Sequence, residues 1–331
     1  MNIIIDGFNK SIHKKDNQII IKEKENILDS IKASHISSIV IIGKGYVTFD
    51  ALTLIAQNNI KLISFDYFGK LNYILESPDW RNVKLKKLQY QLSENKKGIN
   101  IASEIIKSKM INQKSTLTTL NKRKKIPEVE MYKGNISQQI KELNSIKLAN
   151  NHEKVKMKIM GCEGKASFEY WSAIRLLIPP DIGFEKRTKK PTDLLNSMLN
   201  YGYAILASEI TKSILINGLD PYCGFLHFDM DNRTSLTYDL IEDFRQQIVD
   251  KTVIHLINRK RVTTDDLDKR NNSIKLEKRK LIISKIQDKI HSTITYNGEE
   301  LTYAEIINNQ SNNLAKAILN EEKFKGFSLH W

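Results

Sequence analysis

The chain has 331 residues, of which 40% are hydrophobic and 27% are charged, a composition typical of a folded globular protein rather than a disordered one. No apolar run approaches 18 residues, so the sequence predicts no transmembrane helix. The N-terminus lacks the basic flank and apolar core of a signal peptide. The two cysteines, Cys162 and Cys223, form no C-x-x-C pair and suit a reducing compartment, so we expect a cytoplasmic protein.

The positive charge is confined to the later part of the chain. Residues 1–80 contain 9 Lys and Arg against 9 Asp and Glu, whereas residues 81–331 contain 43 against 29 and carry the whole net charge of +14. A neutral N-terminal part joined to a basic remainder indicates that the second part binds a polyanion. The alternative is a general excess of surface lysine.

Residues 1–75 are predicted to form a small β-rich domain. Short β-branched runs at 2–5, 11–14, 19–22, 39–42 and 61–65 are separated by turn signals, and one short helix is expected at 49–57. Short strands with little helix are typical of a β-sandwich or barrel. The stretch has no cluster of catalytic residue types, so we expect it to pack or to pair with another chain.

Residues 76–90 read as a connector, and residues 91–331 as an all-helical domain. Apolar periodicity predicts helices near 99–113, 134–150, 164–178, 192–217, 236–257, 274–292 and 301–320. A basic loop at 122–127 is either a solvated surface or a phosphate contact. The expected fold class is therefore α+β, with a small β-sandwich-like N-terminal domain followed by a larger helical domain.

One acidic residue, Glu163, lies between two glycines directly ahead of the helix predicted at 164–178. The apolar positions of that helix follow its 3.6-residue period from Ala166 onward, and Pro179-Pro180 ends it. A carboxylate in this position is either a helix-start residue favoured by the macrodipole or a functional group that points away from the packed face. Only partner residues elsewhere in the chain can distinguish these two interpretations of Glu163.

Three more chemistry-bearing side chains follow later, namely His227, Asp239 and Glu242. Asp239 and Glu242 are three residues apart and share a helix face. Each has a plain alternative: a core histidine, an acid in a first helical turn, and an ion pair with Arg245. Together with Glu163, they offer carboxylates and one imidazole, a donor set suited to Mn²⁺ or Mg²⁺ more than to zinc. In a basic domain, such an ion would polarise a phosphodiester.

These residues lie in motifs that resemble those of a known family, the CRISPR-associated integrases of spacer acquisition (CRISPR-associated endonuclease one). The resemblance extends over nearly the whole chain. Its strongest blocks are Gly-Cys-Glu-Gly at 161–164 with Ala166, Tyr170 and Trp171; Phe184 with Arg187; Asn196 with Tyr-Gly-Tyr at 201–203; Gly-Leu-Asp-Pro at 218–221 with Gly-Phe-Leu-His at 224–227; and Tyr-Asp-Leu at 238–240 with Glu242, Phe244 and Arg245. It implies a β-rich N-terminal domain and a helical catalytic domain. It also implies a homodimer formed through the N-terminal domains and a small ferredoxin-like partner dimer.

Carried over position by position, the resemblance implies that Glu163, His227 and Glu242 bind Mg²⁺ or Mn²⁺, with Asp239 beside them as a further catalytic residue. Many relatives have aspartate at the position of Glu242. The implied activity is that of a metal-dependent DNA endonuclease and integrase. The 3′-hydroxyl of a short DNA fragment attacks a phosphodiester at the edge of a CRISPR repeat, by transesterification.

The basic residues that follow Pro179-Pro180 are the expected contacts to double-stranded DNA. They are Lys186, Arg187, Lys189 and Lys190, together with Arg245, which either orients Glu242 or reaches a phosphate. Three alternatives stay open. The chain could be a stand-alone integrase of a mobile element, a nuclease for branched DNA, or a DNA-binding scaffold whose site is inactive.

Overall fold

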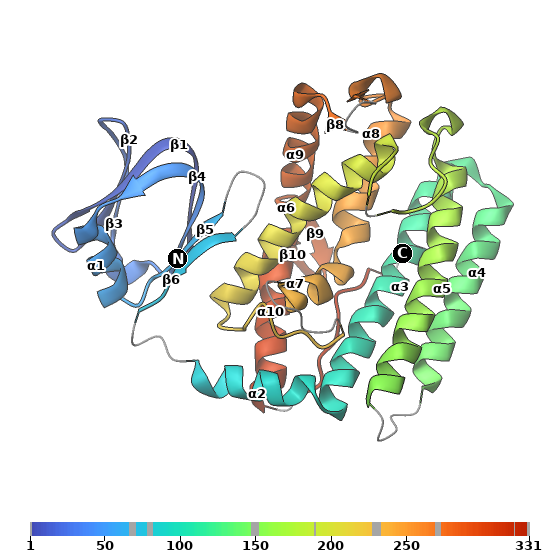
Figure 1. Cartoon of the computed structure of the whole chain (residues 1–331), viewed down its shortest axis with the longest axis horizontal. Helices are drawn as coiled ribbons and strands as arrows, with labels where there is room; N and C mark the ends of the chain where they lie inside the picture. Colours follow the sequence, from blue (N-terminus) through green and yellow to red (C-terminus); the bar gives the residue numbers. More distant parts are fainter. Residues whose placement is uncertain are drawn as a thin grey trace. The chain divides into compact units, whose positions relative to one another are not determined.

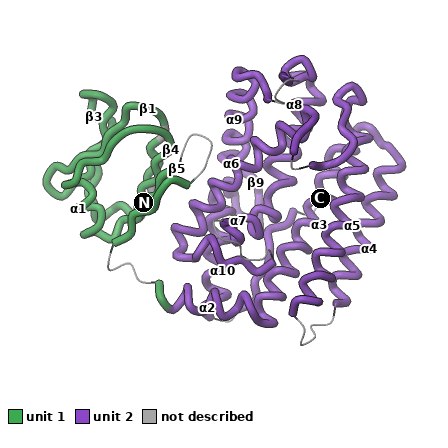
Figure 2. Tube along the Cα trace, in the orientation of Figure 1, with its two compact units in different colours: residues 1–83 green, residues 84–331 purple. Residues whose placement is uncertain are grey.

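The computed structural model describes residues 2–65, 71–77, 82–146, 152–188, 190–226, 233–268, 273–320 and 322–329. The chain forms two compact units, residues 1–83 and residues 84–331 (Figure 2). The division lies inside the connector expected at 76–90. No described helix combines the length and the apolar character that crossing a membrane requires.

Unit 1 is built on one six-stranded mixed sheet in the order β3-β2-β1-β4-β5-β6. Its elements are β1 (Asn2–Lys15), β2 (Gln18–Glu23), β3 (Asn26–Lys32), β4 (Ser38–Val47), α1 (Phe49–Gln57), β5 (Lys61–Phe65) and β6 (Leu71–Leu75). Strand β4 is parallel to both β1 and β5, and the other pairs are antiparallel. The sheet curls on itself (Figure 2). Isoleucines of β1, β2 and β4 form one buried cluster with residues of α1.

The β-rich N-terminal domain is thus confirmed, but a single curled sheet takes the place of the two hydrogen-bonded sheets of a sandwich. The sequence predicted two strands within residues 2–15, separated by a turn. The structure has one strand with a register shift between Phe8 and Lys10, and Asn9 has a φ of 60°. A bulge of this kind increases the local twist and lets one strand bend.

Unit 2 is mainly helical, as predicted, and also contains two small hairpins. Its α-helices are α2 (Val83–Ser93), α3 (Lys96–Lys124), α4 (Pro127–Ser145), α5 (His152–Leu177), α6 (Leu194–Ile216), α7 (Ser235–Leu240), α8 (Lys251–Asn258), α9 (Leu276–Ile290) and α10 (Tyr303–Asn320). The hairpins pair β7 (Leu267–Asp268) with β8 (Ser273–Ile274), and β9 (Thr293–Tyr296) with β10 (Glu299–Thr302). Helices α3, α4 and α5 lie side by side (Figure 1).

Helix α5 begins twelve residues earlier than the sequence predicted, so the expectation that Glu163 stands ahead of a helix is wrong. Glu163 lies in the middle of α5, and both neighbouring glycines are helical. Each glycine weakens a helix by about 1 kcal/mol. Residues Val155, Ile159 and Cys162 extend the buried face of α5 N-terminally, and burying such apolar side chains against neighbouring helices contributes roughly 1.5–3 kcal/mol each, which outweighs the glycines.

The helix predicted at 236–257 is interrupted where it carries Glu242. A 3₁₀ turn at Ile241–Asp243 and a π-helical turn at Gln246–Asp250 separate α7 from α8. The interruption is anchored by the C-terminal segment: the Phe244 and Phe327 rings stack at 4.8 Å, and the backbone N–H of Phe327 donates to Asp243 Oδ2 at 3.1 Å. Asn112 on α3 donates to the carbonyl oxygens of Asp243 and Phe327, each at 2.8 Å. The turn with Glu242 is therefore held firmly against α3.

Candidate active site

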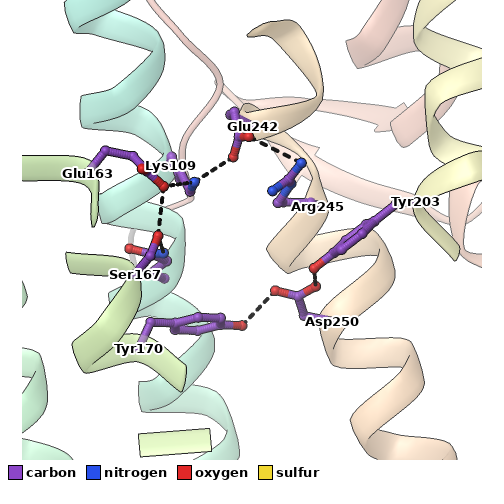
Figure 3. A network of polar contacts seen from close by, with 9 residues as sticks. Lys109, Glu163, Ser167, Tyr170, Tyr203, Glu242, Arg245 and Asp250 are labelled. Carbon is purple, nitrogen blue, oxygen red and sulfur yellow. Dashed lines mark hydrogen bonds and ion pairs between the residues drawn. The ribbon is translucent and has the colours of Figure 1, made fainter. Parts of the chain in front are cut away.

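Two carboxylates predicted from the sequence, Glu163 and Glu242, meet around the ammonium group of Lys109 (Figure 3). Glu163 comes from α5, Glu242 from the 3₁₀ turn after α7, and Lys109 from α3. Lys109 Nζ lies 2.8 Å from Glu242 Oε2 and is hydrogen-bonded to Glu163 Oε1. Ser167, one helical turn after Glu163, donates to the same oxygen at 2.8 Å. Two distant parts of the sequence thus share one cation.

The ion pairs keep both sides of this cluster charged despite burial. The side chains of Lys109 and Glu242 are only 6% and 7% exposed. Burial alone would raise the pKa of Glu163, but the Lys109 charge and the hydrogen bonds from Lys109 and Ser167 hold that pKa at about 2. Burial alone would lower the pKa of Lys109, but Glu242 and Glu163 raise it above its usual value. At neutral pH, Glu163 is therefore a carboxylate and Lys109 an ammonium group.

A second set of polar side chains, beginning with Arg245, contacts the Glu242 side of this cluster. Arg245 Nη2 lies 3.1 Å from Glu242 Oε1, and the Arg245 guanidinium stacks over the Tyr203 ring at 4.7 Å. Tyr203 donates to Asp250 Oδ1 at 2.6 Å, and Tyr170 donates to Oδ2 at 2.9 Å (Figure 3). Burial raises the pKa of Asp250 to about 6, although both hydroxyls favour the carboxylate. In this arrangement, Arg245 is ion-paired with Glu242 and packed over Tyr203, and it also lines the pocket beside Glu163.

Asp239 lies against the backbone of Phe225 and Leu226. Its Oδ2 accepts the backbone N–H of Phe225 at 2.6 Å and that of Leu226 at 3.0 Å. A Cβ on Gly224 would lie 2.9 Å from the same oxygen, so only glycine lets the segment pass this close. These contacts fix the backbone that leads directly into His227. His227 itself lies outside the described residues, so its role as a ligand stays a prediction.

Three of the five expected DNA contacts line a pocket of about 430 Å³ beside Glu163. They are Lys186, Arg187 and Arg245. Lys186 and Lys190 are exposed, whereas Arg187 is half-buried and donates to Asn196 Oδ1 at 2.8 Å and Asn200 Oδ1 at 2.6 Å. Lys189 lies outside the described residues. The pocket thus combines one candidate carboxylate, Glu163, with cations that can face a phosphate.

A family model, CRISPR associated protein Cas1, matches residues 3–288 of the chain. The chain is also 56% identical to a CRISPR-associated protein Cas1 of Methanobrevibacter ruminantium and 34% identical to a CRISPR-associated endonuclease Cas1 of Archaeoglobus fulgidus. Both alignments cover the whole of this chain and of the relative.

The chain belongs to the Cas1 family.

Solved Cas1-like structures have the same fold. A casposase bound to an integration product superposes with a TM-score of 0.78 at 26% identity, covering 99% of this chain and 98% of the casposase. A chain of a partial Cas6-RT-Cas1–Cas2 complex superposes with the same TM-score at 20% identity, covering 100% of this chain and 99% of that one. At that identity, the second likeness concerns the fold alone.

The donor set of this Cas1 chain fits a divalent cation. Glu163 and Glu242 already face one positive charge between them, and carboxylate oxygens are the ligands that Mg²⁺ and Mn²⁺ prefer. Within the described residues, no group of three His, Cys, Asp or Glu side chains is close enough to hold a metal. The third predicted ligand, His227, is outside those residues. The two carboxylates would therefore provide part of the coordination.

Among the members of this site that sequence reasoning missed are Lys109, Tyr203 and Asp250. All three lie on helices that were predicted in part or in full. Lys109 follows Ile105 and Ile106 by four and three residues, so it shares their buried helix face. A charged residue on an apolar face was the available signal, because such a residue needs a buried partner.

Proposed function

We propose that this Cas1 chain is a metal-dependent DNA endonuclease and integrase that inserts short DNA fragments into a CRISPR array. The observation that carries the proposal is the cluster in which Glu163 and Glu242 share one positive charge, at a pocket that Lys186, Arg187 and Arg245 also line. Membership of the Cas1 family supports the substrate and the biological setting. The casposase likeness, to a protein bound to an integration product, supports strand joining.

The proposed reaction is a transesterification. The 3′-hydroxyl oxygen of the fragment forms a bond to phosphorus at the edge of a repeat, the bond from phosphorus to the target's 3′-oxygen breaks, and the hydroxyl proton passes to the departing oxygen through solvent. One phosphodiester replaces another, so no ATP is required. When bound, Mg²⁺ or Mn²⁺ supplies charge stabilisation at the attacking and leaving oxygens.

The chain's own residues position this chemistry. Glu163 and Glu242, with His227, would hold the ion, and Arg245 holds Glu242 in place through its 3.1 Å ion pair. Asp239 fixes the backbone ahead of His227. Lys186, Arg187, Lys189 and Lys190 would bind DNA phosphates, which positions the duplex without reading its sequence.

The partners follow from the same proposal. The substrates are two double-stranded DNAs, the fragment and the repeat. A small ferredoxin-like partner dimer would assemble with the Cas1 homodimer, and the Cas1–Cas2 complex among the structural neighbours supports such an assembly. The N-terminal units would form the homodimer.

The test is a strand-joining assay in Mn²⁺ with a short duplex and a repeat-bearing plasmid. Glu163→Gln should abolish joining and leave duplex binding in EDTA unchanged. Glu169→Gln is the matched control, because Glu169 lies on the same helix and contacts Asn135 at 2.9 Å, away from Lys109. Undiminished joining by Glu163→Gln would refute the proposal. If the wild type binds DNA but joins no strands, the protein would instead be an inactive DNA-binding scaffold.

A second candidate is a stand-alone integrase of a mobile element, which the likeness to a casposase over nearly the whole chain favours. The same assay distinguishes the two. A CRISPR integrase should join efficiently at repeat edges only when the partner dimer is added, whereas a stand-alone integrase should join without it. Cleavage of branched DNA without any joining would instead indicate a nuclease.

A further inference from the structure

Two basic runs that are far apart in the sequence meet at one end of unit 2. Lys124, the last residue of α3, donates from Nζ to the carbonyl oxygen of Leu177 at 2.9 Å, and Asn258, the last residue of α8, donates from Nδ2 to the same oxygen at 3.1 Å. Leu177 ends α5. The run Lys-Arg-Lys-Lys at 122–125 and the run Arg-Lys-Arg at 259–261 are therefore brought together.

Five cations of these helices form what we call the α3–α8 basic surface, defined as Lys122, Arg123, Lys125, Lys251 and Arg259. Lys122, Lys125 and Lys251 line one pocket of about 780 Å³. Burial and the charges of Arg259, Arg123 and Lys251 lower the pKa of His255 on α8, so all three charges act on this one side chain. Lys251 belongs both to the pocket lining and to the charges that act on His255, so it links the basic residues of α3 to those of α8.

The charge of this surface is not balanced within the protein. Across the described ranges, no ion pair involves Lys122, Arg123, Lys125 or Arg259. The acid in the pocket, Glu130, lies 2.7 Å from Lys133. The C-termini of α3, α5 and α8 converge here and contribute roughly −0.5 of a charge each. Set against the four charges of Lys122, Arg123, Lys125 and Arg259, these helix ends leave about 2.5 positive charges uncompensated, which favours a polyanion as ligand.

We propose that the α3–α8 basic surface binds the phosphate backbone of duplex DNA that extends beyond the candidate active site. The inference rests on the proposed function, because that function supplies the duplex. Glu163 and Leu177 lie on the same helix, and the 14 residues between their positions correspond to about 21 Å. At 3.4 Å per base pair, a duplex that runs parallel to α5 from Glu163 would reach the surface after roughly six base pairs.

The experiment compares two double variants of the full chain that each remove two exposed charges from α3. Lys122→Gln with Lys125→Gln alters the surface, and Lys96→Gln with Lys97→Gln alters the opposite end of the helix, about 40 Å away. Binding is measured in EDTA against NaCl concentration, using forked duplexes whose arm is about 4 or about 14 base pairs long. The first variant should lower the salt slope by up to about 1.8 on the long arm only, since each lost phosphate contact lowers it by about 0.9. The control should match the wild type.

An unchanged slope in the first variant would overturn the proposal, as would an equal change on the short arm. A fall in melting temperature with an unchanged slope would assign these lysines to capping the helix ends. An equal slope change with single-stranded RNA would make the surface unselective and refute duplex recognition. If the wild type joins strands in Mn²⁺ while the slope stays unchanged, only this proposal fails. If the wild type neither binds nor joins DNA, the proposed function fails first.

Discussion

Replacing Lys109 by methionine removes the positive charge between Glu163 and Glu242 and keeps a side chain of similar length. Removing one partner of a buried ion pair destabilises a protein by roughly 3–5 kcal/mol. Glu163 is 26% exposed, and Arg245 still lies 3.1 Å from Glu242, so some compensation remains. We therefore expect a loss at the lower end, about 3 kcal/mol, in the absence of divalent ions.

Thermal unfolding in EDTA and in Mn²⁺ measures this effect. For a unit the size of residues 84–331, 1 kcal/mol shifts the melting temperature by about 2–4 °C, so Lys109→Met should melt about 6–12 °C below the wild type in EDTA. Mn²⁺ at about 100 times its Kd stabilises the protein by about 2.7 kcal/mol and should recover most of the loss. In the wild type, Lys109 competes for the same carboxylates, so the Mn²⁺-induced shift should be smaller.

Lys107→Met is the matched control on the same helix. Lys107 pairs with Glu104 at 3.3 Å, and both side chains are about one third exposed, so this pair contributes at most about 1 kcal/mol. The control should melt near the wild type and respond to Mn²⁺ as the wild type does. Equal stability of the two variants in EDTA, or an equal response to Mn²⁺, would refute the reasoning.

Three further predictions concern single groups of the site. The pKa of Glu163 is held at about 2, below the usual value, so the contribution of this carboxylate to stability is present above about pH 4.5 and is lost as the pH falls toward 2. In urea titrations between about pH 5 and 3, Glu163→Gln should therefore lose less stability than the wild type. Parallel losses in the two proteins would contradict this prediction. Asp239→Ala leaves two buried N–H groups unpaired and should lower the free energy of unfolding by about 2–4 kcal/mol. Asp239→Asn keeps an oxygen acceptor, so it should lose only about 1 kcal/mol and keep the wild-type Mn²⁺ affinity in calorimetry. A large fall in the Mn²⁺ affinity of Asp239→Asn would make Asp239 a metal ligand instead. Added methyl groups at Gly161 and Gly164 would meet no atom within 4 Å, so either alanine variant should stabilise α5 by up to about 1 kcal/mol. Of the two glycines, Gly164 lines the Glu163 pocket, so only Gly164→Ala should slow strand joining. Equal joining rates for the two variants would show that DNA does not approach Gly164.

Periodicity of apolar residues predicted the architecture well but not the local geometry of the site. The helical faces of unit 2 and the β-rich character of unit 1 follow directly from such patterns. The helix at Glu163 was placed too late because two glycines weigh heavily in a local reading, whereas packing of Val155 and Ile159 outweighs them in the fold. The change of helix type around Glu242 depends on contacts with the C-terminal segment, far away in the sequence.

The candidate site was predictable where motif residues carry it and not where tertiary contacts do. Glu163 and Glu242 were identified from their motifs, and the structure brings them together. Lys109 was not identified, because one lysine on a helix rich in lysine resembles a solvated residue until its neighbours on the same face are examined. Tyr203 and Asp250 lie on different helices and are joined by a hydrogen bond, which no spacing in the sequence could have predicted.

The location of Mn²⁺ in crystals of the protein tests the central claim most directly. Anomalous scattering at the manganese edge, measured on crystals grown with Mn²⁺, should give a peak that contacts carboxylate oxygens of both Glu163 and Glu242, with Lys109 moved away from at least one of them. A peak bound elsewhere, with the Lys109 ion pairs unchanged, would contradict the account.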